Sequence, residues 1–156
     1  MRYLLVDRIE EVVPGSFARG AKNVAMSEDY LEWHFPGRPV VPGTLVLEMF
    51  AQLAGWHEAV ASDFTRWFLL DRVASARYFG VAVPGDRIDL RVEVVASEDP
   101  ARRRFRAEST VAGERKASVE FEGQSVPLEG LDARERVEQA WKVLKAPAPA
   151  AKRGAP

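Results

Sequence analysis

The longest apolar segment of the chain predicts a central helix. Residues 44–62 follow Pro42-Gly43, contain no proline, and carry large apolar side chains at positions that cover nearly every face of a helix. A helix that is apolar all round is buried rather than laid on a surface. We therefore expect this helix to be covered by other parts of the fold on most sides.

Alternating apolar and polar positions predict strands around this helix. Apolar residues at positions 88, 90, 92 and 94 alternate with charged residues, which is typical of a strand with one face in water. Turn residues separate this strand, 87–96, from the extended segments 102–111 and 114–124, so this half predicts an antiparallel meander. Residues 3–13 and 16–25 are joined by Pro14-Gly15 and predict a hairpin. Residues 67–79 connect the helix to the meander.

The remaining segments lie outside this predicted core. Ser27, as an N-cap followed by two acidic residues, predicts a short helix through Tyr30 and Trp33 that ends before Pro36. Residues 131–145 predict a surface helix, and the Pro/Ala-rich residues 146–156 a disordered tail. A curved antiparallel sheet would cover the central helix. The expected architecture is α+β, with a domain over residues 1–128, a C-terminal surface helix within 129–145 and the tail 146–156.

Composition narrows the classes of function. The chain has 156 residues, 47% of them hydrophobic and 29% charged, with a net charge of -1, so nothing points to nucleic-acid or membrane partners. It contains no cysteine, which excludes disulfides, thiolate metal sites and a cysteine nucleophile. No uncharged apolar run approaches the ~20 residues that span a bilayer, and the N-terminal segment lacks the apolar core of a signal peptide. We expect a cytoplasmic protein.

Two titratable residues are candidates for proton transfer. His34 precedes a Pro-Gly turn, and Glu48 lies within the apolar helix. Histidine titrates near neutral pH and apolar surroundings disfavour an ionised carboxylate, so the two form a plausible acid/base pair. The alternatives are a hydrogen-bonded structural histidine and a partly exposed glutamate, or one side of a dimer salt bridge. His57 follows Glu48 by nine residues, which places it on the opposite helix face, and is interpreted as structural.

Both candidates belong to one motif of fixed spacing. It consists of His34-Phe35-Pro36-Gly37, Pro39, Pro42-Gly43, Leu47-Glu48, Ala51-Gln52 and Gly55. The motif resembles the signature of FabZ-type 3-hydroxyacyl-[acyl carrier protein] dehydratases, and flanking segments extend the resemblance over roughly residues 1–122. The family has the hot-dog fold, a curved antiparallel sheet wrapped around a central buried helix. The resemblance implies this fold here, with a strand directly after the helix.

The resemblance also implies a role for each matching residue. His34 would transfer the proton at the carbon next to the thioester, and Glu48, from the opposite subunit of a dimer, would assist loss of the 3-hydroxyl as water. The backbone N–H of Gly43 would bind the thioester carbonyl, which fits the free N–H groups and positive dipole end of a helix N-terminus. Gln52, one turn after Glu48, could orient the carboxylate or a water. Phe35 is expected to contact the substrate.

The implied reaction removes water from a 3-hydroxyacyl thioester and gives the trans-2-enoyl product, in fatty acid or polyketide-type synthesis. The implied partners are acyl carrier protein and a second copy of the chain, with assembly beyond a homodimer left open. No cofactor is expected beyond the phosphopantetheine of the carrier protein or coenzyme A that holds the substrate, because the chemistry is proton transfer. The sequence contains no HExxH, Walker A or GxGxxG motif.

Other functions remain open on the same fold. A hot-dog acyl thioesterase would use a helix carboxylate to activate water and would not need His34. A non-catalytic acyl-thioester-binding protein is a further alternative. The bifunctional dehydratase/isomerases carry aspartate at the position of Glu48, which disfavours isomerisation here.

Two departures from the family pattern concern access and docking. Trp33 stands where the family usually has a small residue, so we expect its indole at the substrate entrance, where it would narrow or redirect the opening. Residues 78–82 stand where family members commonly carry basic residues. Arginines elsewhere could provide a basic surface for the acidic carrier protein or could be solvated strand and hairpin positions: Arg72, Arg77, Arg87 and Arg102-Arg103-Arg104.

Overall fold

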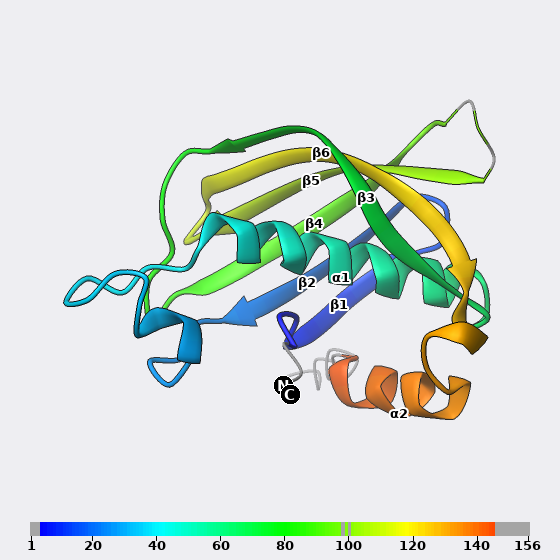
Figure 1. The fold of residues 1–156 in the computed structure, drawn as a ribbon, viewed down its shortest axis with the longest axis horizontal. Coiled ribbons are helices and arrows are strands. Elements are labelled where there is room, and N and C mark those ends of the chain that lie inside the picture. Colours follow the sequence, from blue (N-terminus) through cyan, green and yellow to red (C-terminus); the bar gives the residue numbers. More distant parts are fainter. Residues whose placement is uncertain (1–3, 98, 100, 146–156) are drawn as a thin grey trace, which may run out of the picture.

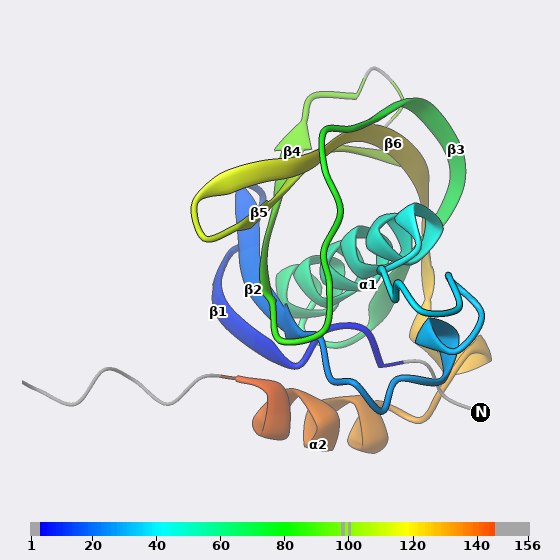
Figure 2. The same cartoon turned by 90° about the vertical axis from the view of Figure 1, so that its left-hand side faces the viewer.

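A curved antiparallel sheet wraps around one long helix (Figures 1 and 2). The computed structural model describes residues 4–97, 99 and 101–145. The elements, in chain order, are β1 (Arg8–Val13), β2 (Phe17–Asn23), the 3-10 turn η1 (Asp29–Leu31), α1 (Gly43–Ala61), β3 (Arg66–Tyr78), β4 (Arg87–Val95), β5 (Arg102–Val111), β6 (Glu114–Pro127), the 3-10 turn η2 (Leu128–Gly130) and α2 (Arg134–Leu144). None of the described helices is long and apolar enough to cross a membrane.

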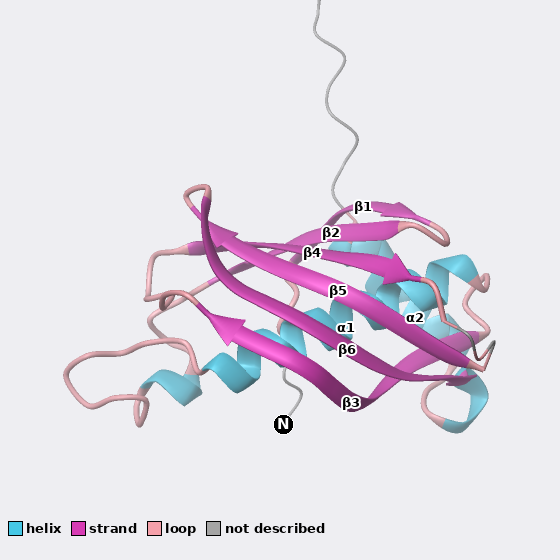
Figure 3. Cartoon of the chain, turned by 90° about the horizontal axis from the view of Figure 1, so that it is seen from above, coloured by secondary structure: helices cyan, strands magenta, loops and turns pink. Residues whose placement is uncertain are grey.

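The sheet has the strand order β1-β2-β4-β5-β6-β3, and every pairing is antiparallel (Figure 3). The predicted hairpin and the predicted meander are confirmed. Along β4, Ile88, Leu90 and Val92 are buried while the charged residues between them face outward, as period-two alternation requires. The strand after the helix, β3, forms one edge of the sheet beside β6, which continues three residues beyond the predicted end at residue 124.

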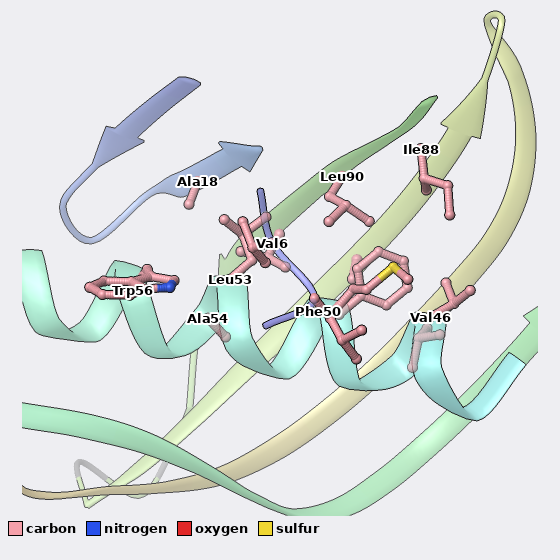
Figure 4. Close-up of a cluster of buried hydrophobic side chains, with 14 of the residues drawn as sticks. Val6, Ala18, Val46, Phe50, Leu53, Ala54, Trp56, Ile88 and Leu90 are labelled. Carbon is pink, nitrogen blue, oxygen red and sulfur yellow. The ribbon is translucent and has the colours of Figure 1, made fainter. Parts of the chain in front are cut away.

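The concave face of the sheet holds α1, whose inward side chains form the core. Figure 4 shows Val46, Phe50 and Leu53 on the side of α1 that faces the sheet, where Leu90 of β4 belongs to the same core cluster. Phe50 and Leu53 have no exposed surface, so each contributes the full gain of burying a large apolar side chain, about 1.5–3 kcal/mol. This arrangement confirms the predicted hot-dog architecture of a curved sheet around a central helix.

One stripe of α1 is not covered, which corrects the expectation that nearly every face would be buried. Thr44 and Glu48 are exposed. The sheet curves around only part of the helix circumference (Figure 2), so part of α1 stays open to solvent. Glu48 therefore does not lie in apolar surroundings within a single chain.

The predicted short helix is also corrected. The segment forms only one 3-10 turn, Asp29–Leu31, and its N-cap position is occupied by Glu28 without a side-chain capping bond, so Ser27 is not the N-cap. Leu31 of this turn is buried in the core, and the chain then continues into the motif loop.

The C-terminal helix α2 packs on the core rather than lying loosely on its surface. Val137 is buried, and the ring of Trp141 lies 6.1 Å from the rings of both Trp56 and Phe64. The predicted helix is confirmed over Arg134–Leu144. The predicted disordered tail, residues 146–156, lies outside the described residues.

A buried polar cluster lies at the C-terminal end of α1. His57 is 3% exposed, and its Nε2 lies 3.3 Å from the Val13 carbonyl oxygen. Its Nδ1 has no hydrogen-bond partner among the described residues. Burial lowers the pKa of His57 and outweighs the opposing effects of the Val13 hydrogen bond and the Glu58 charge. The folded protein therefore holds His57 as a neutral ring, consistent with a structural role.

This burial predicts a pH dependence of stability. His57 binds a proton less readily in the folded state than in the unfolded state, where its pKa is about 6.5. The contribution of His57 to the free energy of unfolding is fully present above about pH 6.5. It decreases as the pH falls from that value toward the lower pKa of the folded state. We expect His57→Phe to flatten the loss of stability between about pH 7 and pH 5, measured by urea unfolding. Equal pH profiles for the variant and the wild type would contradict this.

Candidate active site

The motif loop between η1 and α1 holds His34 in a defined orientation. Backbone bonds between Phe35 and Arg38, of 3.2 and 3.0 Å, close a tight turn in which Gly37 has a φ of 76°, a conformation that glycine adopts without strain. The carbonyl oxygen of His34 accepts a bond of 2.8 Å from the Val40 N–H. The imidazole Nδ1 lies 3.0 Å from the Val40 carbonyl oxygen. With the proton on Nδ1, this contact is a hydrogen bond, and Nε2 carries the lone pair that a base needs.

The imidazole borders a pocket of about 260 Å³. The pocket is lined by His34, Phe35 and Gly43 together with the side of β3, β4, β5 and β6 that faces this end of the helix. Most of the lining is apolar, with valine, isoleucine and alanine side chains, and the polar groups include Tyr78, Ser109 and Lys116. The structure thus brings together three of the residues that the motif singled out, in a small and largely apolar recess.

Gly43 presents the N-terminus of α1 at this pocket. The helix begins at Gly43 after Pro42, so the first N–H groups have no acceptor within the helix. The Tyr78 hydroxyl donates a hydrogen bond of 2.8 Å to the Gly43 carbonyl oxygen, and burial raises the pKa of Tyr78, which keeps the donor protonated. A Cβ on residue 43 would lie 3.0 Å from the Tyr78 ring. A larger residue at position 43 would therefore crowd the Tyr78 ring, which would have to shift by a few tenths of an ångström.

Sequence reasoning missed the three polar lining residues Tyr78, Ser109 and Lys116, and of these Tyr78 bonds directly to the start of α1. In the sequence, residues 78–82 stand out only because family members commonly carry basic residues at these positions. The contact between Tyr78 and Gly43 joins positions 35 residues apart. No local signal in the sequence indicates that the end of β3 returns to the start of α1.

Glu48 and Gln52 form a second group, one helical turn apart on α1. The amide nitrogen of Gln52 donates a hydrogen bond of 3.0 Å to a Glu48 carboxylate oxygen, and the amide oxygen accepts one of 2.9 Å from the Leu5 N–H. The predicted shared face is confirmed. Neither residue lines the pocket that contains His34. Within one chain, the structure therefore does not place the predicted base and the predicted acid in the same pocket.

The two aromatic residues of the loop differ in position. The Phe35 ring stacks on the His34 imidazole with centroids 4.4 Å apart and lines the pocket. Trp33 is 75% exposed and does not line it. A role for Trp33 in controlling substrate access stays a prediction.

Most of the arginines considered for a basic surface are engaged with carboxylates. The Nε of Arg103 lies 3.1 Å from the buried Glu58, so this side chain points inward rather than toward a partner. The other contacts are Arg72 with Glu122 at 3.0 Å, Arg102 with Asp71 at 2.6 Å, Arg104 with Glu122 at 3.7 Å, and Arg87 with Asp89 at 2.8 Å and with Glu10. These pairs favour the interpretation of solvated strand positions. Over the described part of the chain, no three acidic or histidine side chains are placed to hold a metal ion.

Comparisons with known proteins agree with the motif and the fold. The model of the FabA-like domain matches residues 1–128. A protein of Nitratidesulfovibrio vulgaris, strain Miyazaki F, named 3-hydroxyacyl-[acyl-carrier-protein] dehydratase FabZ, is 40% identical over 96 residues, which span 60% of this chain and 62% of that protein. A Myxococcus xanthus protein of the same name is 39% identical over 123 residues, 76% of this chain and 79% of that protein.

A comparison with a solved structure supports the fold and nothing beyond it. The Streptococcus mutans protein bound to acetyl CoA superposes with a TM-score of 0.63 at 12% identity, over 81% of this chain and 94% of that one. The family match covers the sheet, the central helix and the motif loop together. The chain belongs to the FabA-like family.

Proposed function

We propose that this protein is a 3-hydroxyacyl-[acyl carrier protein] dehydratase, which removes water from a 3-hydroxyacyl thioester and releases the trans-2-enoyl thioester. The observation that carries the proposal is the pocket that joins His34 to the N-terminus of α1. There, the Val40 carbonyl lies 3.0 Å from Nδ1 of His34, and Gly43 begins the helix. The names of the relatives support the same activity.

The chemistry follows from these two features. Nε2 of His34 removes the proton from the carbon next to the thioester, and negative charge develops on the thioester oxygen. The N–H of Gly43 and the positive end of the α1 dipole stabilise that charge, and they do so more strongly in a recess with little water. The 3-hydroxyl leaves as water after it receives a proton from Glu48. Proton transfers of this kind require no metal or redox cofactor.

The position of Glu48 supports a site shared between two subunits. β3 lies at an edge of the sheet and exposes Leu69 and Val73, 42% and 38% respectively. The opposite edge strand, β1, already meets Lys145 in an isolated bridge. A long exposed edge strand is a template for pairing with another chain, and pairing of two copies is symmetric. A homodimer joined along β3 would bring the exposed Glu48 of one subunit toward His34 of the other.

The substrate is carried on the phosphopantetheine of acyl carrier protein or on coenzyme A, and the pathway is fatty acid or a related biosynthesis. The partners are the carrier protein and the second subunit. The cytoplasm is the proposed location, which fits a chain without cysteine.

An ultraviolet assay of enoyl-thioester hydration and its reverse tests the proposal. It is run on carrier-protein and coenzyme A thioesters, with free thiol measured in parallel. A dehydratase gives a reversible loss of enoyl absorbance without thiol. Thiol release at unchanged enoyl absorbance would establish the thioesterase instead, and tight binding with neither signal would establish a non-catalytic acyl-thioester-binding protein.

Glu48→Gln tests the proposed acid. The amide cannot donate the acidic proton, so turnover should fall by about 10²-fold or more, while the helix keeps a polar side chain at an exposed position. The measurement is kcat in the same assay, with the melting temperature as a check of folding. Glu32→Gln, at an exposed position outside the motif, is the matched control and should keep full activity. Normal turnover by Glu48→Gln would remove this residue from the mechanism.

A further inference from the structure

A largely apolar groove of about 380 Å³ lies between α1, β3 and α2, with Gln52 and the ion pair of Asp132 and Arg136 as the polar part of its lining. The ring of Trp67 forms one side, packed so closely on the helix that a Cβ on Gly55 would lie 2.4 Å from its atoms. Trp56 of α1 and Leu69 of β3 continue the apolar lining. The groove is separate from the His34 pocket, because the two share no lining residue.

The groove starts beside the proposed acid. Glu48, Gln52 and Trp56 follow one another at intervals of four residues, so they lie along one face of α1. Glu48 is exposed, Gln52 bonds to it and lines the groove, and the buried Trp56 lines the groove one helical turn further along α1. Eight residues of helix span about 12 Å. A substrate whose 3-hydroxyl is at Glu48 has its acyl tail leaving from that same carbon, next to the mouth of this groove.

The outer wall of the groove comes from the C-terminal segment that the FabA-like domain, residues 1–128, does not include. Leu131, Val137 and Ala140 supply apolar side chains to it. Trp141 holds the wall in place through ring contacts with Trp56 and Phe64, 6.1 Å away in each case. Figures 1 and 2 show α2 on the side of the molecule that the sheet leaves open.

We propose that this groove binds the distal part of a medium or long acyl chain and that α2 determines which chain lengths the protein accepts. The inference rests on the proposed function, since Glu48 fixes where the tail begins. In the shared site, the tail lies along α1 of the subunit that supplies Glu48. An apolar groove is the complement of a polymethylene chain, whose affinity grows with each methylene buried.

The test fills the groove from α2. Ala140→Phe places a ring in the groove, whereas Val143→Phe adds the same ring on the outward face of α2, where the native side chain is 76% exposed. Dehydration is measured with 3-hydroxybutanoyl and 3-hydroxydodecanoyl thioesters. Ala140→Phe should lower kcat/KM for the dodecanoyl substrate by about tenfold or more and leave the butanoyl value within about twofold. Val143→Phe should change neither.

The outcomes distinguish a failure of the groove proposal from a failure of the proposed dehydratase function. Equal loss on both substrates, or no loss on either, overturns the groove proposal. If the wild type dehydrates neither substrate, the proposed function fails, and the groove is tested by binding of dodecanoyl pantetheine, followed by the fluorescence of Trp56 and Trp67. Binding that weakens about tenfold in Ala140→Phe but not in Val143→Phe would still support the groove, and equal binding would overturn it.

Discussion

Replacing His34 with alanine should lower turnover by about 10²-fold or more while the protein stays folded. The variant removes the proposed base, whose Nδ1 lies 3.0 Å from the Val40 carbonyl oxygen. The protein should stay folded because the imidazole is only half-buried, in a surface loop. The loss should appear in kcat for both hydration and dehydration, because the same group removes and returns the proton. The ultraviolet assay measures both directions.

The other histidine of the chain provides a matched control. His57→Phe alters a buried ring at the opposite end of α1 and should keep kcat at neutral pH. The assignment of His34 as the base is wrong if His34→Ala turns over normally. It is also wrong if both histidine variants lose activity to the same extent, since that would indicate a general effect on folding.

Glu58→Ala should cost about 3 kcal/mol of unfolding free energy, one of the largest losses that a single polar substitution in this chain can cause. Glu58 is 4% exposed, bonds to Arg103 at 3.1 Å and accepts a hydrogen bond from the Ser125 hydroxyl. Ser125 in turn accepts a bond of 2.7 Å from Arg66. Removing the carboxylate leaves the Arg103 charge without this partner. Because the Arg103 side chain is 34% exposed, water offsets part of that penalty and the lower end of the range for buried pairs applies.

Urea unfolding at fixed protein concentration measures this loss. Glu138→Ala, which removes an exposed i,i+4 partner of Arg134 on α2, is the control and should cost no more than about 0.5 kcal/mol. Glu58→Gln keeps an acceptor for Ser125 and should fall between the two. A Glu58→Ala protein within about 1 kcal/mol of the wild type would show that the cluster contributes little to stability.

The elements could be predicted from the sequence wherever local chemistry defines them. Pro42-Gly43 starts α1 within one residue of the predicted helix, and the alternation across Ile88 and Leu90 locates β4. The exposure of Glu48 could not be predicted in this way. A run of apolar residues indicates that a helix is buried, but which stripe remains open depends on how far a distant sheet curves around it.

For the candidate site too, residues in a local motif could be predicted, whereas contacts between distant parts of the chain could not. The motif predicts His34, Gly43 and Gln52 as candidates, because fixed spacing along one loop and one helix is a local property. Tyr78 and the packing of Trp141 on Trp56 join positions far apart in the chain. Their partners are chosen by the tertiary fold, and neither residue has a neighbouring sequence pattern that indicates its contact.

Purified heterodimers test the central claim, a dehydratase site made by His34 of one subunit and Glu48 of the other. Subunits carrying His34→Ala and Glu48→Gln are coexpressed with different tags, and wild type paired with the double variant is prepared in the same way. In a two-fold dimer, the first combination keeps one intact site and should have about half of wild-type activity, while the second breaks both sites and should have almost none. The reverse result, an inactive first heterodimer and a half-active second one, would place both residues in a single subunit and contradict the account.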